Sequence, residues 1–281
     1  MIPAAFDYEV AESVDHAIAL LGERDDAKLL AGGHSLIPAM KLRLARPAIL
    51  VDVGRIADLS YVRESDGQIA IGALTRHRDV ASAALLREHC PIISHTAGQV
   101  GDPQVRHRGT IGGSLAHGDP ASDLPTVVLA LDGELVVRGS AGERTIPASA
   151  FFVGVFQTAV APDEMLVEIR VPKLGSDTGW SYTKMSRRAQ DWATVAVAAV
   201  VQRSNGSIGK ASIALTNMGA TPLRAAAAEA AIAGGGSIDD ASAVASEGTE
   251  PSSDLAASAE FRGHLARVLT RRALEEAAAR T

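Results

Sequence analysis

Cysteine is almost absent from this sequence: Cys90 is the only one among 281 residues. A single thiol excludes an internal disulfide bond and an iron–sulfur cluster held by four cysteines of this chain. No CxxC pair or His/Cys spacing typical of a zinc site is present either. The sequence therefore predicts no metal site, so any metal centre that works with this protein would lie on another chain.

Aromatic residues are scarce as well, at 4% of the sequence, whereas 26 residues are glycine and alanine is abundant. With few large rings available, a bound cofactor would be held mainly by backbone groups and small side chains. Hydrophobic residues make up 47% of the chain, which is enough to bury a substantial core in one large domain or two modest ones.

Long apolar runs and long basic runs are also missing. No stretch approaches the roughly 18 apolar residues of a membrane helix, and the start, MIPAAFDYEVAES, lacks the basic and apolar regions of a signal peptide. We therefore expect a cytoplasmic protein, with attachment to the inner face of a membrane through partners left open. The formal net charge is −6, and no Lys/Arg run suits a row of phosphates, so we expect no nucleic acid partner.

Short strands and helices alternate through the first part of the sequence. Hydrophobic periodicity predicts a first helix with Val10, Val14, Ile18 and Leu21 on one face. Further strands are expected at residues 28–30, 49–53, 68–71, 134–138 and 165–171, and further helices at residues 78–89, 92–100 and 126–131.

The pattern changes from Gly179 onward. Apolar segments at residues 180–185, 194–202 and 208–217 resemble an antiparallel meander, and Ala-rich helices are expected at 225–233 and 261–279. We therefore predict an α+β protein with a domain at residues 1–177, made of lobes at about 1–56 and 57–177, and a separate C-terminal domain at 178–281.

The sharpest local feature is the segment Ala31-Gly32-Gly33-His34-Ser35, which follows a predicted strand. Paired glycines permit positive φ angles and close approach, so consecutive backbone N–H groups can form a nest for an anion. The hydroxyl of Ser35 could cap a short helix or donate to a phosphate oxygen. For this pair alone, an ordinary strand-to-helix turn is the favoured interpretation.

A second glycine pair lies in the loop Thr110-Ile111-Gly112-Gly113-Ser114. Its two hydroxyls flank residues without side chains, and Asp123 could accept hydrogen bonds from a sugar hydroxyl or a base amine. The alternative is a tight turn in which Asp123 is the N-cap of the following helix.

Together the two glycine segments could hold both phosphates of a dinucleotide. Neither is a GxGxxG motif, and no GxxxxGK[ST] motif occurs, so a Rossmann site and a P-loop are poorly supported. The residues by themselves indicate a dinucleotide or diphosphate site of another type.

Four segments in order carry a more specific signal: AGGHSLIPAMKLRLARPAILVDVGRI, TIGGSLAHGDPASDLPTVVLAL, Asp163 to Leu166 leading to Val171-Pro172, and YTKMSRR at 182–188. This arrangement closely resembles the medium, flavin-binding subunit of the xanthine dehydrogenase and carbon monoxide dehydrogenase family. The resemblance implies a two-lobed, vanillyl-alcohol-oxidase-like (PCMH-type) FAD-binding fold with a smaller C-terminal α+β domain.

The resemblance also implies roles for individual residues. The residues implied to line the FAD pyrophosphate are Lys28, Leu29, Leu30, Ala31, Gly32, Gly33, His34, Ser35 and Leu36. Those implied to grip it from the other lobe are Thr110, Ile111, Gly112, Gly113 and Ser114. Asp123 would hold the ribose or adenine end, Leu166 would lie against the isoalloxazine ring, and Lys184 would lie near the flavin's polar edge or phosphates.

Alternatives remain for Lys184, for Trp192 and for two histidines. Thr183 competes with Lys184, whose other interpretation is a solvated strand residue, and Trp192 is either a shield for the flavin or a core residue. His34 and His117 raise the question of covalent attachment, but the resembled subunits bind FAD non-covalently, and that is the expectation here.

The implied complex has a large molybdenum-cofactor subunit and a small subunit with two [2Fe-2S] clusters, as a dimer of heterotrimers. This chain would accept electrons from the clusters and pass them to NAD, a quinone or another acceptor, with no catalytic acid, base or nucleophile of its own. Two competing hypotheses are a self-contained FAD-dependent oxidase or reductase and a flavin-free assembly subunit. The substrate of the complex is not predictable from this chain.

Overall fold

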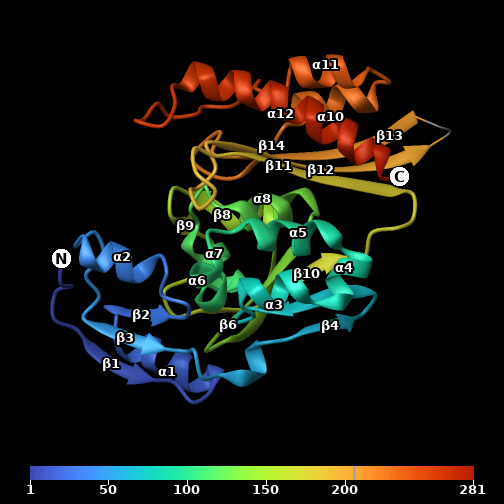
Figure 1. The fold of residues 1–281 in the computed structure, drawn as a ribbon. Helices are drawn as coiled ribbons and strands as arrows, with labels where there is room; N and C mark the ends of the chain where they lie inside the picture. The colour runs from blue at the N-terminus through green and yellow to red at the C-terminus, as the bar shows by residue number, and fades with distance from the viewer. Residues whose placement is uncertain (205–206) are drawn as a thin grey trace.

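The computed structural model describes residues 1–204 and 207–281. Figure 1 shows three parts: a small N-terminal lobe, a central lobe and a C-terminal layer that lies across the central lobe.

The N-terminal lobe is built on a parallel sheet with the order β1-β3-β2. Its elements are β1 (Asp7–Val10), α1 (Val14–Glu23), β2 (Ala27–Leu30), α2 (Leu36–Lys41) and β3 (Ile49–Asp52). The predicted strands near residues 28–30 and 49–53 are confirmed. The first helix begins later than predicted, because Val10 ends β1 and Ser13 caps the helix by accepting a hydrogen bond from the His16 N–H.

The central lobe contains a five-stranded sheet in the order β4-β5-β10-β6-β7, in which each strand is antiparallel to its neighbours. The strands are β4 (Val62–Ser65), β5 (Gln68–Gly72), β6 (Glu134–Gly139), β7 (Gly142–Pro147) and β10 (Met165–Pro172). The helices are α3 (His77–Ser82), α4 (Ala84–His89), α5 (Pro91–Gln99), α6 (Pro103–Arg108), α7 (Ile111–His117) and α8 (Asp123–Ala130). Three short elements complete this part of the chain: the 3-10 turn η1 (Ala57–Leu59), the helix α9 (Ala148–Phe151) and the hairpin of β8 (Phe152–Gly154) with β9 (Gln157–Thr158).

The single helix predicted for residues 78–89 is wrong, because Ala83 has extended backbone angles and separates α3 from α4. Val80 and Leu86 are both fully buried in the same core cluster. On an unbroken helix, side chains six residues apart point in directions about 120° from each other. The break lets both side chains enter one core.

The C-terminal part is an antiparallel meander in which each strand pairs with the next, as predicted. Its strands are β11 (Thr178–Met185), β12 (Val195–Ser204), β13 (Ser207–Thr216) and β14 (Leu223–Arg224), and its helices are α10 (Ala226–Ala233), α11 (Ile238–Ala243) and α12 (Ala259–Ala279). The helix α11 lies between the two predicted Ala-rich helices and is fixed by a capping box between Ser237 and Asp240.

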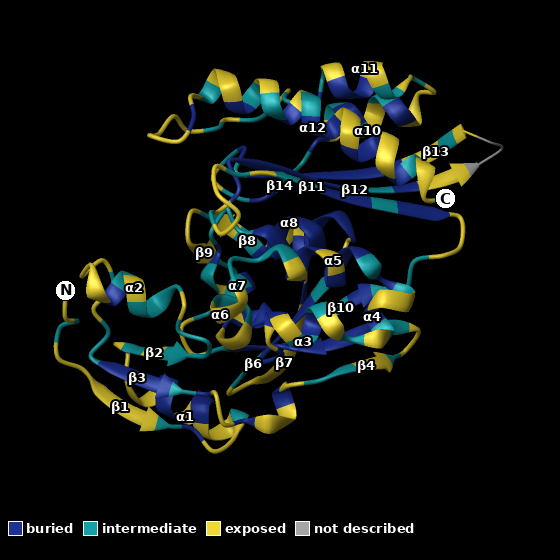
Figure 2. Cartoon of the chain, in the orientation of Figure 1, coloured by how far each residue is buried: buried dark blue, intermediate teal, exposed yellow. Residues whose placement is uncertain are grey.

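Both faces of the meander are buried, as Figure 2 shows. Val195 and Val197 belong to the core under the C-terminal helices, whereas Ala196 and Ala198 belong to the core of the central lobe. This alternation follows from the two-residue repeat of a strand. A buried hydrogen bond of 2.7 Å from Thr216 to Thr126 of α8 ties the meander to the central lobe.

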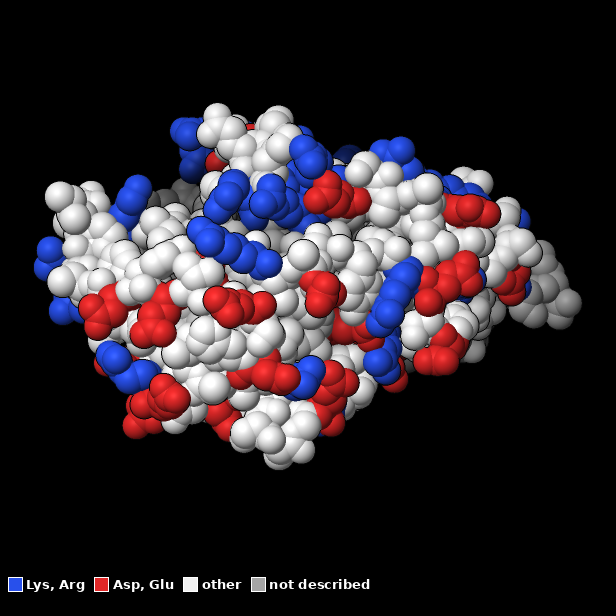
Figure 3. All heavy atoms as spheres, turned by 90° about the horizontal axis from the view of Figure 1, so that it is seen from below, with Lys and Arg blue, Asp and Glu red and all other residues white. Residues whose placement is uncertain are grey.

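On the face drawn in Figure 3, Lys and Arg side chains gather toward the upper part and Asp and Glu predominate below. Within the described ranges, 1–204 and 207–281, no helix is long and apolar enough to cross a membrane.

Candidate functional site

The two glycine segments, residues 31–35 and 110–114, meet where the N-terminal lobe touches the central lobe. A Cβ atom on Gly32 would lie 2.4 Å from the carbonyl oxygen of Arg108 and 2.7 Å from the Cα of Gly109. A Cβ atom on Gly113 would lie 3.8 Å from the Cβ of Ala31. Glycine at position 32 is therefore what lets the two lobes approach at this point.

The first segment leaves its backbone donors free. Gly33 has a φ of 76°, and the N–H groups of Gly32 to Ser35 donate to no acceptor within the described parts of the chain. Ser35 occupies the N-cap position of α2, but its hydroxyl caps none of the described residues of that helix. Four successive unpaired amides around a left-handed glycine suit a bound anion.

The second segment is the first turn of α7 and not the predicted loop. Thr110 is the N-cap and its Oγ1 accepts a hydrogen bond from the Gly113 N–H at 3.1 Å. The N–H groups of Ile111 and Gly112 already donate to the carbonyls of Thr75 and Ala73. The residues of this segment that a bound group could reach are therefore mainly the exposed Gly113 and the half-buried Ser114.

The other residues implied to line the pyrophosphate surround the first segment. Lys28 and His34 are exposed, and Leu29, Leu30 and Leu36 are half-buried. His117 is half-buried at the end of α7, where its ring contacts Phe156 with centroids 5.0 Å apart, and burial lowers its pKa.

His77 lies behind the second segment, a position that the sequence did not single out. Its backbone N–H donates to the Gly109 carbonyl at 3.0 Å, and a Cβ atom on Gly109 would lie 2.8 Å from its Cδ2. Burial lowers the pKa of His77 to about 4, so the imidazole is neutral near pH 7. A lone histidine at the start of a helix gives no sequence signal that its ring will be buried against Gly109.

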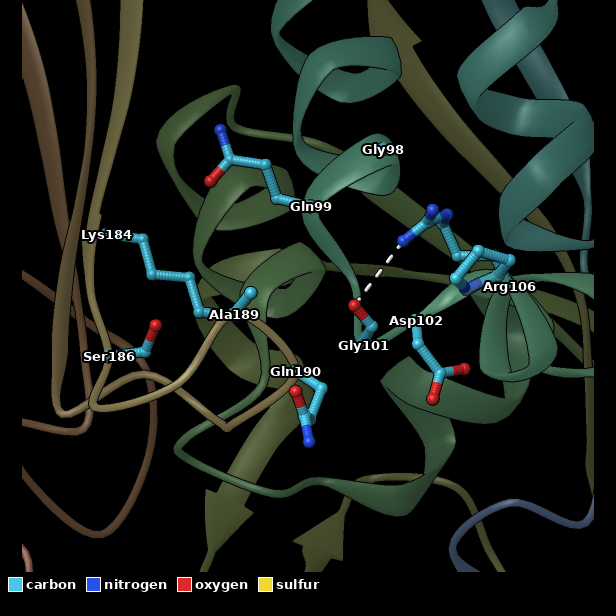
Figure 4. Close-up of a pocket in the computed structure, with 10 residues that line it drawn as sticks. Gly98, Gln99, Gly101, Asp102, Arg106, Lys184, Ser186, Ala189 and Gln190 are labelled. Carbon is cyan, nitrogen blue, oxygen red and sulfur yellow. Dashed lines mark hydrogen bonds between the residues drawn. The ribbon is translucent and has the colours of Figure 1, made fainter.

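A cavity of about 490 Å³ lies between the central lobe and the C-terminal meander. Its lining residues are Gly98, Gln99, Gly101, Asp102, Pro103, Arg106, Lys184, Ser186, Ala189 and Gln190. Figure 4 shows Lys184 and Ser186 on one side and Asp102 and Arg106 on the other. Helix α6 runs from this cavity, which Asp102 and Arg106 line, to the contact between Arg108 and Gly32. The distance along the helix is about 9 Å.

Asp123 and Lys184 form a buried ion pair, with Oδ2 and Nζ 3.0 Å apart and side chains 7% and 6% exposed. The hydroxyl of Tyr182 donates to the other carboxylate oxygen at 2.6 Å. The alternative of Lys184 as a solvated strand residue is therefore wrong. Asp123 is the first residue of α8 and Ser122 is the N-cap, so the capping role considered for Asp123 is wrong by one position.

The structure separates Lys184 from its competitor Thr183. Lys184 lies on the strand face toward α8 and the cavity. Thr183 shares the opposite face with Ser181, which bonds to Glu276 of α12. The Thr183 hydroxyl is buried, with no hydrogen-bond partner in the described part of the protein. The geometry favours Lys184 as the residue that faces a ligand in the cavity.

Leu166 and Trp192 differ in exposure. Leu166 is 5% exposed in the central core, next to a bulge in β10. Trp192 is 63% exposed, so the alternative that it is a core residue is wrong. It belongs to the connection between β11 and β12, which contributes Ser186, Ala189 and Gln190 to the cavity.

These features fit FAD: unpaired amides for the pyrophosphate, glycines where the lobes meet and a cavity with a buried ammonium. Among the residues that the structure describes, no group of three or more His, Cys, Asp or Glu side chains could hold a metal ion.

Comparison with known proteins identifies the family. Residues 4–174 match the FAD binding domain in molybdopterin dehydrogenase, and residues 180–277 match the CO dehydrogenase flavoprotein C-terminal domain. The chain belongs to the FAD-binding medium subunits of the molybdenum hydroxylases. The predicted family, its two-part FAD-binding fold and FAD as the cofactor are thereby confirmed.

Individual members of the family are similar over their full length. The carbon monoxide dehydrogenase medium chain of Hydrogenophaga pseudoflava is 41% identical, covering 100% of this chain and 99% of the relative. The 6-hydroxypseudooxynicotine dehydrogenase complex subunit alpha of Paenarthrobacter nicotinovorans is 40% identical, covering 99% and 96%. A solved carbon monoxide dehydrogenase from Hydrogenophaga pseudoflava superposes with a TM-score of 0.97 at 44% identity, covering 100% of this chain and 99% of that one.

Proposed function

We propose that this medium subunit is an electron-transfer flavoprotein within a heteromeric molybdenum hydroxylase. It accepts electrons from iron–sulfur clusters of a partner subunit and passes them to an external acceptor. The observation that carries the proposal is the row of unpaired amides at Gly32 to Ser35, which lies at one end of a path along α6 that leads to the cavity beside Lys184.

In this proposal the two glycine segments hold FAD non-covalently. The amides of Gly32 to Ser35 would hold the pyrophosphate, with Gly113 and Ser114 on its central-lobe side. Lys184, which lines the cavity, would face the polar edge of the flavin ring. When bound, FAD supplies a redox centre that takes up one or two electrons, and the protein positions it and sets its electrostatic environment.

Two assignments that came from the resemblance are placed as follows. Leu166 would contact the ring from the central core. Asp123, assigned to the ribose or adenine end, would instead act through Lys184, because Tyr182 and Lys184 hold its two carboxylate oxygens. Residues 1–177 are the FAD-binding domain and residues 178–281 the C-terminal domain.

The partners in this proposal are a large molybdenum-cofactor subunit and a small subunit with two [2Fe-2S] clusters, in a cytoplasmic dimer of heterotrimers. The acceptor is NAD, a quinone or another carrier. The names of the relatives support a shared role, because similar chains are named as subunits of a carbon monoxide dehydrogenase and of a 6-hydroxypseudooxynicotine dehydrogenase complex. Substrate choice then lies with the partner subunits.

The test compares the isolated chain, loaded with FAD, with the complete complex under anaerobic conditions. Candidate donors are mixed rapidly with each sample while the iron–sulfur and flavin absorbances are followed. We expect donors to reduce the clusters first and the flavin second in the complex, and to leave the flavin of the isolated chain oxidised. Equally fast flavin reduction in the isolated chain would indicate a self-contained flavoenzyme instead.

A further inference from the structure

The buried network of Asp123, Tyr182 and Lys184 joins two parts of the molecule. Asp123 starts α8 in the central lobe, whereas Tyr182 and Lys184 come from β11 of the meander. Tyr182 and Lys184 are two residues apart on one strand face, so both side chains reach the same carboxylate. The distances are 2.6 Å from the Tyr182 hydroxyl to Asp123 Oδ1 and 3.0 Å from Lys184 Nζ to Asp123 Oδ2.

Burial makes this pairing obligatory for the lysine. An ammonium group removed from water is tolerated only when it is paired and hydrogen-bonded, and the Lys184 side chain is 6% exposed. Burial raises the pKa of Asp123, while the Lys184 ammonium and the Tyr182 hydroxyl oppose that rise. The pKa of Tyr182 is raised well above its ordinary value, first by burial and then by the Asp123 carboxylate, so its hydroxyl stays a hydrogen-bond donor.

Only one member of the network reaches the cavity wall. Lys184 lines the cavity (Figure 4), next to Ser186 two residues further along. Asp123 and Tyr182 lie behind Lys184, and both are buried. Any effect of this carboxylate and this hydroxyl on a ring in the cavity therefore passes through the position and the charge of Lys184.

We propose that Asp123 and Tyr182 are positioning residues that hold the Lys184 ammonium at the cavity wall and, with it, set how much more tightly reduced FAD binds than oxidised FAD. This inference rests on the proposed function. Two-electron reduction adds negative charge to the flavin ring, which a nearby ammonium stabilises. Because Asp123 acts through Lys184, removing the ammonium and removing the carboxylate that holds it should shift the ratio of the two affinities in the same direction.

The experiment measures the dissociation constants of oxidised and chemically reduced FAD for the flavin-free full chain, under anaerobic conditions. We expect Lys184→Met to lower the preference for reduced FAD by about tenfold. Asp123→Asn should lower it in the same direction, because the buried ammonium loses the carboxylate that holds it. For a two-electron couple, tenfold corresponds to about 30 mV in the flavin potential. Lys184→Arg keeps the charge and should restore the wild-type ratio, and Tyr182→Phe should shift the ratio less than Asp123→Asn does.

Two controls separate charge from folding. Lys210→Met removes an exposed lysine from β13 and should leave the ratio unchanged. Glu168→Gln removes a buried carboxylate that also accepts from a tyrosine, Tyr61, at 2.6 Å but lies outside the cavity lining, and it too should leave the ratio unchanged. If Asp123→Asn fails to fold, Tyr182→Phe decides on the positioning role, and the comparison of Lys184→Met with Lys184→Arg decides on the charge.

A higher preference for reduced FAD in Asp123→Asn, or unchanged ratios in Lys184→Met and Asp123→Asn chains that still bind FAD, would overturn the inference. A wild-type chain that binds neither form of FAD would instead contradict the proposed function.

Discussion

Gly32-Gly33 and Gly112-Gly113 are matching pairs in the sequence, each followed by a hydroxyl-bearing residue within two positions. In the structure, the first pair keeps its N–H groups free, whereas in the second pair Gly112 donates to Ala73 and Gly113 donates to Thr110. Side-chain Cβ atoms would collide at both pairs, with Arg108 in one case and with Ala73 in the other. A glycine pair thus indicates close backbone approach, but the partner is either a ligand or the protein itself, and only the pairing of the amides distinguishes these two cases.

The largest effect is expected for Gly32→Ala. The added Cβ would lie 2.4 Å from the backbone oxygen of Arg108, which cannot move without separating the lobes. We expect a loss of about 3 kcal/mol in unfolding free energy and a large loss of FAD affinity, measured by urea unfolding and by FAD titration. Gly22→Ala is the matched control, because a Cβ there has open space in α1, and it should stabilise the helix by up to about 1 kcal/mol.

Gly112→Ala should separate folding from binding. Its Cβ would lie 2.5 Å from the Cβ of Ala73 in a buried contact, so we expect a destabilisation of about 2 kcal/mol. Because its amide serves the protein, the variant that remains folded should keep most of its FAD affinity. If FAD affinity fell as far as in Gly32→Ala, the two segments would be equivalent after all.

His77 should make the second segment sensitive to acid. Its pKa is lowered from 6.5 to about 4 by burial, so between these values the unfolded chain binds a proton that the folded chain does not. Stability must therefore fall as the pH falls through this window, by about 2 kcal/mol between pH 7 and pH 5. Urea unfolding at both pH values should show a smaller loss in His77→Gln, and an equal loss would exclude His77 as the cause.

The smallest effects concern the two hydroxyls. Thr110→Ala removes the N-cap of α7 and should lower the unfolding free energy by about 1 kcal/mol. Ser114→Ala should leave that energy nearly unchanged and weaken FAD binding a few-fold. Measuring both quantities for both variants tests the comparison, and the reverse pattern would assign the phosphate contact to Thr110.

The sequence predicted the features that depend on local pattern. The meander from β11 to β13 follows from apolar alternation, and the approach of backbones at Gly32 follows from the absence of a side chain. The family resemblance extended this to the cofactor and the fold, because four ordered segments match.

What the sequence could not predict depends on partners distant in the chain. The amides of Ile111 and Gly112 are paired because Thr75 and Ala73 lie beside them, more than thirty positions away. Lys184 is buried because α8 brings Asp123 to it, and α3 separates from α4 so that both can pack on one core. Neither the local spacing nor the composition of the sequence indicates any of these contacts.

The most direct test of FAD binding at the first glycine segment is the amount of FAD released from purified chain. Wild-type protein and Gly22→Ala, incubated with FAD and freed of excess, are heat-denatured and the supernatant is analysed by chromatography. We expect close to one free FAD per chain in both, and far less in Gly32→Ala. Flavin that stays attached to the denatured chain, or no flavin in the wild type, would contradict this expectation.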